Sequence, residues 1–200
     1  WDPGGAQARY GIEPDLSTFG KALANGFSVS ALAGKRDFMR LGGFDHDLER
    51  VFLLSTTHGA ETHGLAAAIA TMQVYNSEPV IETLWSRGER LASGLKAAAS
   101  SAGVVEHVPI LGPPCCLVFG SRDETGQPSQ PFRTLLMQEL IERGILAPSL
   151  VVNYSHSEAD IDRTIEAFEG AFAVYRSALD EGIVKYLRGR PVKPAIRPFA

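Results

Sequence analysis

The chain has 200 residues, of which 44% are hydrophobic and 21% are charged, and its formal net charge is −4. These values are ordinary for globular proteins and exclude a disordered or fibrous chain. The acidic balance also excludes the basic surface that nucleic acids or acidic membranes attract, so we expect small-molecule chemistry instead.

Membrane and metal sites are not expected from the sequence. No apolar stretch approaches the roughly 20 residues of a membrane span, and no charged and then apolar leader precedes the fold, so we expect a cytoplasmic protein. The two cysteines, Cys115 and Cys116, are adjacent in an apolar run over residues 115–119. The apolar run indicates a buried strand and not a disulfide framework. Because neighbouring strand residues point to opposite faces, the two sulfur atoms are poorly placed to share a metal ion.

The first predicted elements surround a single charged residue. Residues 1–7 are predicted to form a loop, and residues 16–34 contain one charge, that of Lys21, which indicates a buried environment. The spacing of glycines in this stretch predicts short strands and tight turns, with a candidate strand over 27–33. Residues 35–41 are predicted to form a short helix.

The middle of the chain alternates between predicted strands and helices. A strand over 52–54 is predicted to enter a polar turn, which an alanine-rich helix over 65–74 follows. Apolar residues recur at helical spacing among charged residues over 80–99, which predicts an amphipathic helix. Further strands are predicted at 104–105, 115–119 and 145–152.

Helix signals are clear towards the end of the chain. A helix is predicted over 131–143, ended by Gly144. Ser157 and Asp160 resemble a capping box that opens a last helix, which continues to Leu179 with apolar residues at steps of three and four. The proline-rich tail, 188–200, is predicted to lie extended over a surface, because proline breaks helices and central strands.

Lys21 is the candidate for covalent chemistry. A lysine in an apolar segment more often packs its stem and extends its ammonium group into water. Here Gly20 removes steric bulk beside the lysine, and small residues follow it. Burial disfavours the charged ammonium form, so the neutral amine becomes available to attack a carbonyl group and form a Schiff base.

The motif around Lys21 resembles the lysine segment of the class III aminotransferases, which use pyridoxal 5'-phosphate. It reads Pro-Asp-Leu-Ser-Thr-Phe-Gly-Lys-Ala-Leu-Ala-Asn-Gly over 14–26, with Ser-Ala-Leu-Ala-Gly over 30–34. Within the family it is most similar to the glutamate-1-semialdehyde aminomutase-like members. The resemblance implies that Lys21 holds the cofactor as a Schiff base and, once freed, moves a proton between the substrate's α-carbon and C4′ of the cofactor.

The resemblance also implies a fold and a domain organisation. The fold is α/β, the fold type I of pyridoxal-phosphate-dependent transferases. We expect residues 1–75 to form the end of the large cofactor-binding domain, and residues 76–200 to form the small C-terminal α+β domain with its extended tail. The likeness continues through Ser149, the last helix and the tail, and so covers nearly the whole chain.

A second motif, Ser-Thr-Thr-His-Gly-Ala-Glu-Thr over 55–62, is similar to the family segment whose threonine reaches the cofactor phosphate of the neighbouring subunit. Counting back from the glycine assigns this role to Thr56, with Thr57 the adjacent alternative. Hydroxyl and N–H groups before a helix suit a phosphate, although an ordinary helix cap has the same composition. The resemblance implies a homodimer with shared active sites. His58 and His63 are poorly spaced for a metal site.

Two departures limit the expected activity. Many class III transaminases carry an arginine for the substrate carboxylate where this chain has Leu-Val-Val-Asn-Tyr over 150–154, which favours an aminomutase-like or amino-sugar-like substrate. In the family, the carboxylate that holds the pyridine nitrogen protonated precedes a loop resembling residues 1–7. We therefore expect this carboxylate, the phosphate loop and the ring that stacks on the cofactor to lie upstream, and the 200 residues alone to be nearly inactive.

Two functions follow from these expectations. The first is a pyridoxal-phosphate-dependent aminotransferase or aminomutase that acts on a small amino-aldehyde, keto acid or amino-sugar-type substrate. The second is a catalytically incomplete C-terminal fragment that serves only as a subunit or interaction module, which the start at Trp1 favours. If the chain alone proves active, Asp2, Asp15 and Asp37 are the first candidates for the acidic partner.

Overall fold

The computed structural model describes residues 1–49, 51, 57, 59 and 61–193. The chain divides into two compact units, Trp1–Ile81 and Glu82–Ala200. The domain boundary expected after residue 75 remains a prediction.

The first unit begins with a short helix, α1 (Gly5–Tyr10), where the sequence predicts a loop. None of the residues of α1 is buried. Its sequence therefore carries no apolar periodicity from which a helix could be predicted. Gly11 ends the helix in the left-handed conformation with φ 64°, and its N–H donates to the carbonyl group of Ala8. Glycine adopts this conformation without steric cost, as is common after the last residue of a helix.

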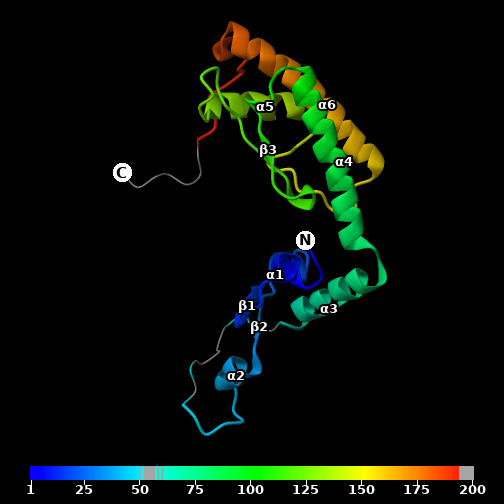
Figure 1. Ribbon diagram of the computed structural model, residues 1–200, viewed down its shortest axis with the longest axis vertical. Coiled ribbons are helices and arrows are strands. Elements are labelled where there is room, and N and C mark those ends of the chain that lie inside the picture. The colour runs from blue at the N-terminus through cyan, green and yellow to red at the C-terminus, as the bar shows by residue number, and fades with distance from the viewer. Residues whose placement is uncertain (50, 52–56, 58, 60, 194–200) are drawn as a thin grey trace. The chain divides into compact units, whose positions relative to one another are not determined.

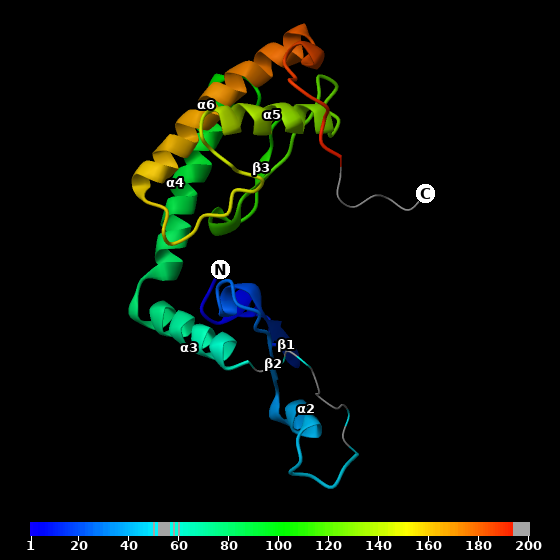
Figure 2. The ribbon, with the colours of Figure 1, turned by 180° about the vertical axis from the view of Figure 1, so that it is seen from behind.

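Two short strands, β1 (Leu16–Phe19) and β2 (Ala31–Gly34), pair antiparallel from Leu16 opposite Gly34 to Phe19 opposite Ala31. The strand predicted over 27–33 therefore begins later than expected. Figure 2 shows the two strands side by side, with α2 (Arg36–Met39) after β2. A turn of 3₁₀-helix, η2 (Arg40–Gly42), follows, and the two together account for the helix predicted over 35–41.

The last element of the first unit is α3 (Thr62–Ser77), which confirms the helix predicted over 65–74. It contains no Asp, Glu, Lys or Arg. Its buried residues are Gly64 and Ala68, and a β-carbon on Gly64 would lie 2.9 Å from Cγ2 of Val29. The predicted strand over 52–54 lies outside the described residues.

The second unit packs three long helices around a small sheet. Figure 1 shows α4 alongside α6, and α5 packs against α6. Two very short strands pair antiparallel, with Ile110 opposite Phe119 and Leu111 opposite Val118. The elements are α4 (Val80–Ser101), β3 (Ile110–Leu111), η3 (Pro114–Cys116), β4 (Val118–Phe119), α5 (Gln130–Glu142), α6 (Glu158–Glu181) and η4 (Ile183–Lys185).

Capping residues set the ends of these helices as the sequence predicts. The backbone N–H of Asp160 donates to Oγ of Ser157 at 3.2 Å, and the N–H of Ser157 donates to the Asp160 carboxylate at 2.7 Å. This is the predicted capping box, and it opens α6. Gly144, with φ 78°, follows α5 as expected.

Large aromatic side chains fill the core of the second unit. The rings of Phe132 and Tyr175 lie 4.8 Å apart between centroids, and those of Phe168 and Phe172 lie 5.4 Å apart. All four side chains are fully buried. Three of them come from one face of α6, as the predicted periodicity requires.

Several predicted strands of this unit are wrong in extent. Val104 is fully buried but the segment 104–105 is not a strand, and 145–152 is irregular apart from one isolated bridge between Leu150 and Leu117. Of the run 115–119, only Val118–Phe119 is a strand. An apolar run indicates burial, whereas a strand also requires a partner to complete its backbone hydrogen bonds.

The described part of the tail lies against α5, in agreement with the prediction of an extended strap. The N–H of Arg188 donates to Oε1 of Gln138 at 3.0 Å, and that of Val192 donates to Oγ1 of Thr134 at 2.9 Å. Among the residues that the structure describes, no helix has both the length and the hydrophobicity needed to cross a membrane.

Candidate functional site

Lys21 lies in a compact loop between β1 and β2. It is the first residue of a 3₁₀ turn, η1 (Lys21–Leu23), and the extended Gly20 precedes it. Lys21 has φ 48° and Asn25 has φ 45°, and these two are the non-glycine residues with positive φ in the described part of the chain. This left-handed conformation is uncommon for a residue with a β-carbon, although asparagine adopts it more readily than most.

Backbone hydrogen bonds close the loop on itself. The N–H of Leu23 donates to the carbonyl group of Gly20 at 3.1 Å, and the N–H of Asn25 donates to that of Lys21 at 3.2 Å. The N–H of Phe27 then donates to the carbonyl group of Ala24 at 3.3 Å. Ala24 is 2% exposed and anchors the loop in the first unit, where η1 lies against α3.

The Lys21 side chain is exposed, which corrects the expectation of a buried environment. A sheet of two four-residue strands presents little apolar surface for packing, and all four residues of β2 are exposed. Within the described part of the chain, Nζ of Lys21 has no hydrogen-bond or ion-pair partner. Lys35 differs, because its Nζ lies 2.7 Å from Oδ1 of Asp15.

The other predicted site residues are placed only in part. Thr56 lies outside the described residues, whereas the alternative Thr57 is exposed and lies in a turn. Of the candidate acidic partners, Asp15 is bound to Lys35, and the Asp2 carboxylate accepts from the N–H of Gly4 at 2.7 Å.

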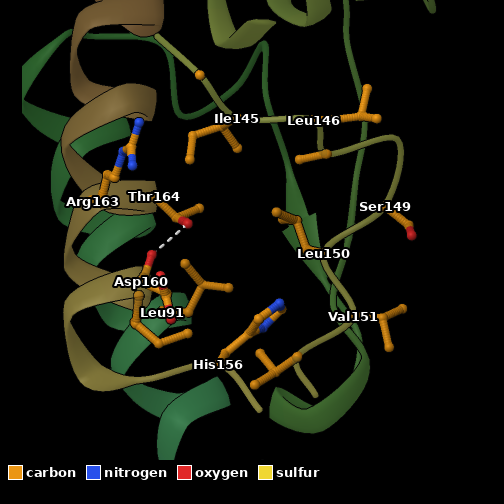
Figure 3. Close-up of a pocket in the computed structure, with 14 residues that line it drawn as sticks. Leu91, Ile145, Leu146, Ser149, Leu150, Val151, His156, Asp160, Arg163 and Thr164 are labelled. Atoms are coloured by element: carbon orange, nitrogen blue, oxygen red, sulfur yellow. Dashed lines mark hydrogen bonds between the residues drawn. The ribbon is translucent and has the colours of Figure 1, made fainter. Parts of the chain in front are cut away.

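A pocket of about 290 Å³ lies in the second unit, between α6 and the segment 144–152. Figure 3 shows His156 projecting into this space, whereas Ser149 points away from it. The ring of His156 already contacts the Asn153 side chain at 2.9 Å, and Oγ1 of Thr164 donates to the carbonyl group of Asp160 at 2.7 Å. The apolar residues that line the pocket are Leu91, Ile145, Leu146, Leu150, Val151, Val152 and Ile161.

Arg87 of α4 contacts the end of the segment 150–154, which contains no arginine. Arg87 of α4 donates from NH1 to the carbonyl group of Tyr154 at 2.9 Å, and its Nε lies 3.3 Å from Oε1 of Glu158. Arg90 forms two bonds to the Asp162 carboxylate, at 2.8 and 2.9 Å. These contacts join α4 to the start of α6 and occupy both guanidinium groups, so the two arginines stabilise the unit.

The family model described as aminotransferase class III matches residues 5–172 of the chain. Glutamate-1-semialdehyde 2,1-aminomutase of Desulforudis audaxviator is 34% identical over 184 residues, which cover 84% of this chain and 40% of the relative. The 3-aminobutyryl-CoA aminotransferase of Cloacimonas acidaminovorans is 29% identical, with 88% of this chain and 41% of the relative covered. The chain thus spans about two fifths of the length of the curated relatives it matches.

Solved structures show the fold. The FumI protein of Sphingopyxis sp. MTA144, solved in its pyridoxal-phosphate internal aldimine form, has a TM-score of 0.74 and 25% identity, and covers 88% of this chain and 41% of that protein. An omega-transaminase from Sphaerobacter thermophilus has the same TM-score with 22% identity, and 86% and 41% are covered. The fold of the chain is therefore part of the fold type I of pyridoxal-phosphate-dependent transferases, as the sequence predicts.

Proposed function

The chain belongs to the class III aminotransferase family, whose members use pyridoxal phosphate, and we propose that it takes part in moving an amino group on a small substrate, with Lys21 as the catalytic residue. The observation that carries the proposal is the Lys21 loop. Its motif lies within the matched residues, its backbone is held in an uncommon conformation, and its amine has no partner in the described part of the chain. Such backbone outliers cluster at functional sites.

The residues of the loop fit the cofactor. Bound pyridoxal phosphate supplies an aldehyde carbon for an amine and a ring that withdraws electrons from the carbon being deprotonated. Nζ of Lys21 would hold the cofactor at its aldehyde carbon. Once a substrate amine took its place there, the freed Nζ would take a proton from the substrate carbon that bears the amino group and return it at C4′ of the cofactor.

The proposal includes a homodimer in which Thr56 binds the cofactor phosphate of the partner subunit. Support comes from α3, which directly follows the threonine segment and carries no Asp, Glu, Lys or Arg. On α3, Leu65, Ile69 and Met72 are 46%, 54% and 45% exposed. An uncharged helix with exposed apolar residues on successive turns is suited to burial against another protein surface.

The substrate proposed is a small amino-aldehyde, keto acid or amino-sugar-type compound. One relative is named as an aminomutase and another as an aminotransferase of an acyl-CoA substrate. These names support an amino-group substrate and do not select one compound. The segment 150–154 contains no arginine, and Arg87 is already bonded to Tyr154 and Glu158. This favours a substrate whose binding does not depend on an arginine at this segment. The cytoplasmic location stays a prediction.

The alternative proposal is a non-catalytic role as a subunit or interaction module. The exposed apolar face of α3 favours it, because such a face binds a partner whether or not the lysine is used. The low turnover expected of the 200 residues by themselves stays a prediction. Retention of the cofactor distinguishes the two roles.

Lys21→Ala and the matched variant Lys35→Ala test the proposed function. We expect Lys21→Ala to abolish the visible absorption of covalently held pyridoxal phosphate, while Lys35→Ala retains it. Lys35 is the suitable control because it lies in the same unit and its ammonium group already pairs with Asp15. The opposite pattern would show that Lys21 is not the cofactor lysine, and no absorption in any form would favour the non-catalytic role.

A further inference from the structure

The loop that carries Lys21 contains two residues in the left-handed conformation, four positions apart. Lys21 has φ 48° and Asn25 has φ 45°, and Gly26, with φ 116°, follows directly. Each left-handed residue with a β-carbon costs free energy, and lysine has no local bond that offsets this cost as asparagine can. The conformation of Lys21 must therefore be imposed by the residues around it.

One hydrogen bond connects the two left-handed residues. The backbone N–H of Asn25 donates to the carbonyl group of Lys21 at 3.2 Å. The left-handed conformations of Asn25 and Gly26 form the turn that follows, in which the N–H of Phe27 donates to the carbonyl group of Ala24 at 3.3 Å. Between them, Ala24 is buried and fixes the loop in the unit, whereas Lys21 and Asn25 are both exposed.

From this geometry we propose that Asn25 is a positioning residue for Lys21: its left-handed backbone closes the turn from Ala24 to Phe27, and this turn keeps the N–H of Asn25 on the Lys21 carbonyl group and holds the Lys21 backbone in its uncommon conformation. The inference rests on the proposed function, because it assigns a purpose to the fixed Lys21 backbone only if Nζ bonds to the cofactor. The backbone N–H of residue 25 forms the bond with any side chain except proline. The contribution of the asparagine is thus its tolerance of positive φ.

Tolerance of positive φ sets an expected order among substitutions at residue 25 that does not follow side-chain polarity. Glycine adopts positive φ freely and aspartate more readily than most residues, whereas alanine offers no compensation. Asn25→Gly and Asn25→Asp should therefore preserve the loop. Asn25→Ala should make the competent conformation a minor one, which lowers the apparent affinity for the cofactor by about tenfold.

The experiment compares the purified protein with Asn25→Ala, Asn25→Gly and Asn25→Asp, and with Ser28→Ala as a control for an exposed residue just beyond the loop. Pyridoxal 5'-phosphate is titrated against each, the adduct is trapped with borohydride, and the label is quantified on the peptide that contains Lys21. Hydrogen exchange of the residue 25 amide and the midpoint of thermal unfolding are measured alongside.

We expect about tenfold weaker labelling and faster amide exchange for Asn25→Ala alone, with unchanged unfolding midpoints and with normal labelling of Asn25→Gly, Asn25→Asp and Ser28→Ala. Labelling of the alanine variant as strong as that of the unsubstituted protein would overturn the inference while leaving Lys21 as the cofactor lysine. A glycine variant as weak as the alanine variant would also overturn it, because the side chain would then act directly. Label absent from Lys21 in the unsubstituted protein would refute the proposed function itself.

Discussion

Removing the hydroxyl group of Tyr175 tests how the core of the second unit is stabilised. Tyr175 is fully buried, and its hydroxyl donates to the carbonyl group of Arg122 at 2.7 Å and accepts from the N–H of Arg122 at 3.0 Å. Burial raises the pKa of Tyr175 far above its usual range, so the hydroxyl stays protonated and remains a donor at all ordinary pH values.

The loss of unfolding free energy in Tyr175→Phe depends on which hydrogen bonds the backbone groups of Arg122 retain. The N–H of Arg122 also donates to the carbonyl group of His107 at 2.9 Å, so it remains bonded in the variant. The Arg122 carbonyl group loses the hydroxyl, and Arg122 is only half-buried, which lets water replace part of the bond. We therefore expect a loss of about 1.5 kcal/mol in the free energy of unfolding, or about 3–6 °C in the unfolding midpoint.

The assay is thermal and urea unfolding of Tyr175→Phe beside Tyr10→Phe, whose side chain is 60% exposed. The control should change stability by less than about 0.5 kcal/mol. Equal, small effects in the two variants would show that the Tyr175 hydroxyl contributes no stability. A loss well above about 3 kcal/mol would mean that the core rearranges, which a simple loss of one hydrogen bond does not explain.

Three further predictions concern packing, pH and the subunit interface. Gly88→Ala should destabilise the protein by about 1–3 kcal/mol in urea unfolding, because the added carbon would overlap the backbone carbonyl group of Pro114. An alanine variant as stable as the unsubstituted protein would contradict this. The bond to the Ser157 hydroxyl lowers the pKa of Asp160. The Asp160 carboxylate therefore contributes fully to stability above the ordinary carboxyl pKa of about 4, and this contribution is lost as pH falls through the lower pKa of the folded state. Asp160→Asn should remove this pH dependence of the unfolding free energy, and an unchanged dependence in the variant would contradict the assignment. Thr56→Ala should weaken cofactor retention by about 1.5–3 kcal/mol. A mixed dimer of Thr56→Ala and Lys21→Ala subunits should keep one cofactor site with both residues intact. Defects that stay confined to each mutated chain, with no intact site in the mixed dimer, would place Thr56 in the site of its own subunit.

Helix ends could be predicted because their signals are local. The Ser157–Asp160 capping box lies within four residues, and Gly144 ends α5 by a conformation that glycine alone adopts freely. The short strands could not be predicted, because the apolar residues of 145–152 show burial and leave open whether a partner strand exists. Leu150 makes a single bridge to Leu117, and the rest of its segment packs without a ladder.

The place of Lys21 in a turn could be predicted from the sequence, whereas its backbone conformation could not. The two flanking glycines of the Lys21 motif indicate the turn, and the catalytic role of Lys21 stays a prediction. No sequence rule places a lysine in the left-handed region, since its side chain gives no local preference for it. Asn25 did carry a usable signal, because asparagine before glycine is typical of positive φ.

The measurement that tests the central claim most directly is the identity of the residue that bonds to the cofactor. The protein is incubated with pyridoxal 5'-phosphate and reduced with borohydride, and its peptides are then mapped by mass spectrometry. We predict a pyridoxyl group on Lys21, whose amine has no partner in the described part of the chain. A label on Lys35 or Lys96 in place of Lys21 would contradict the account.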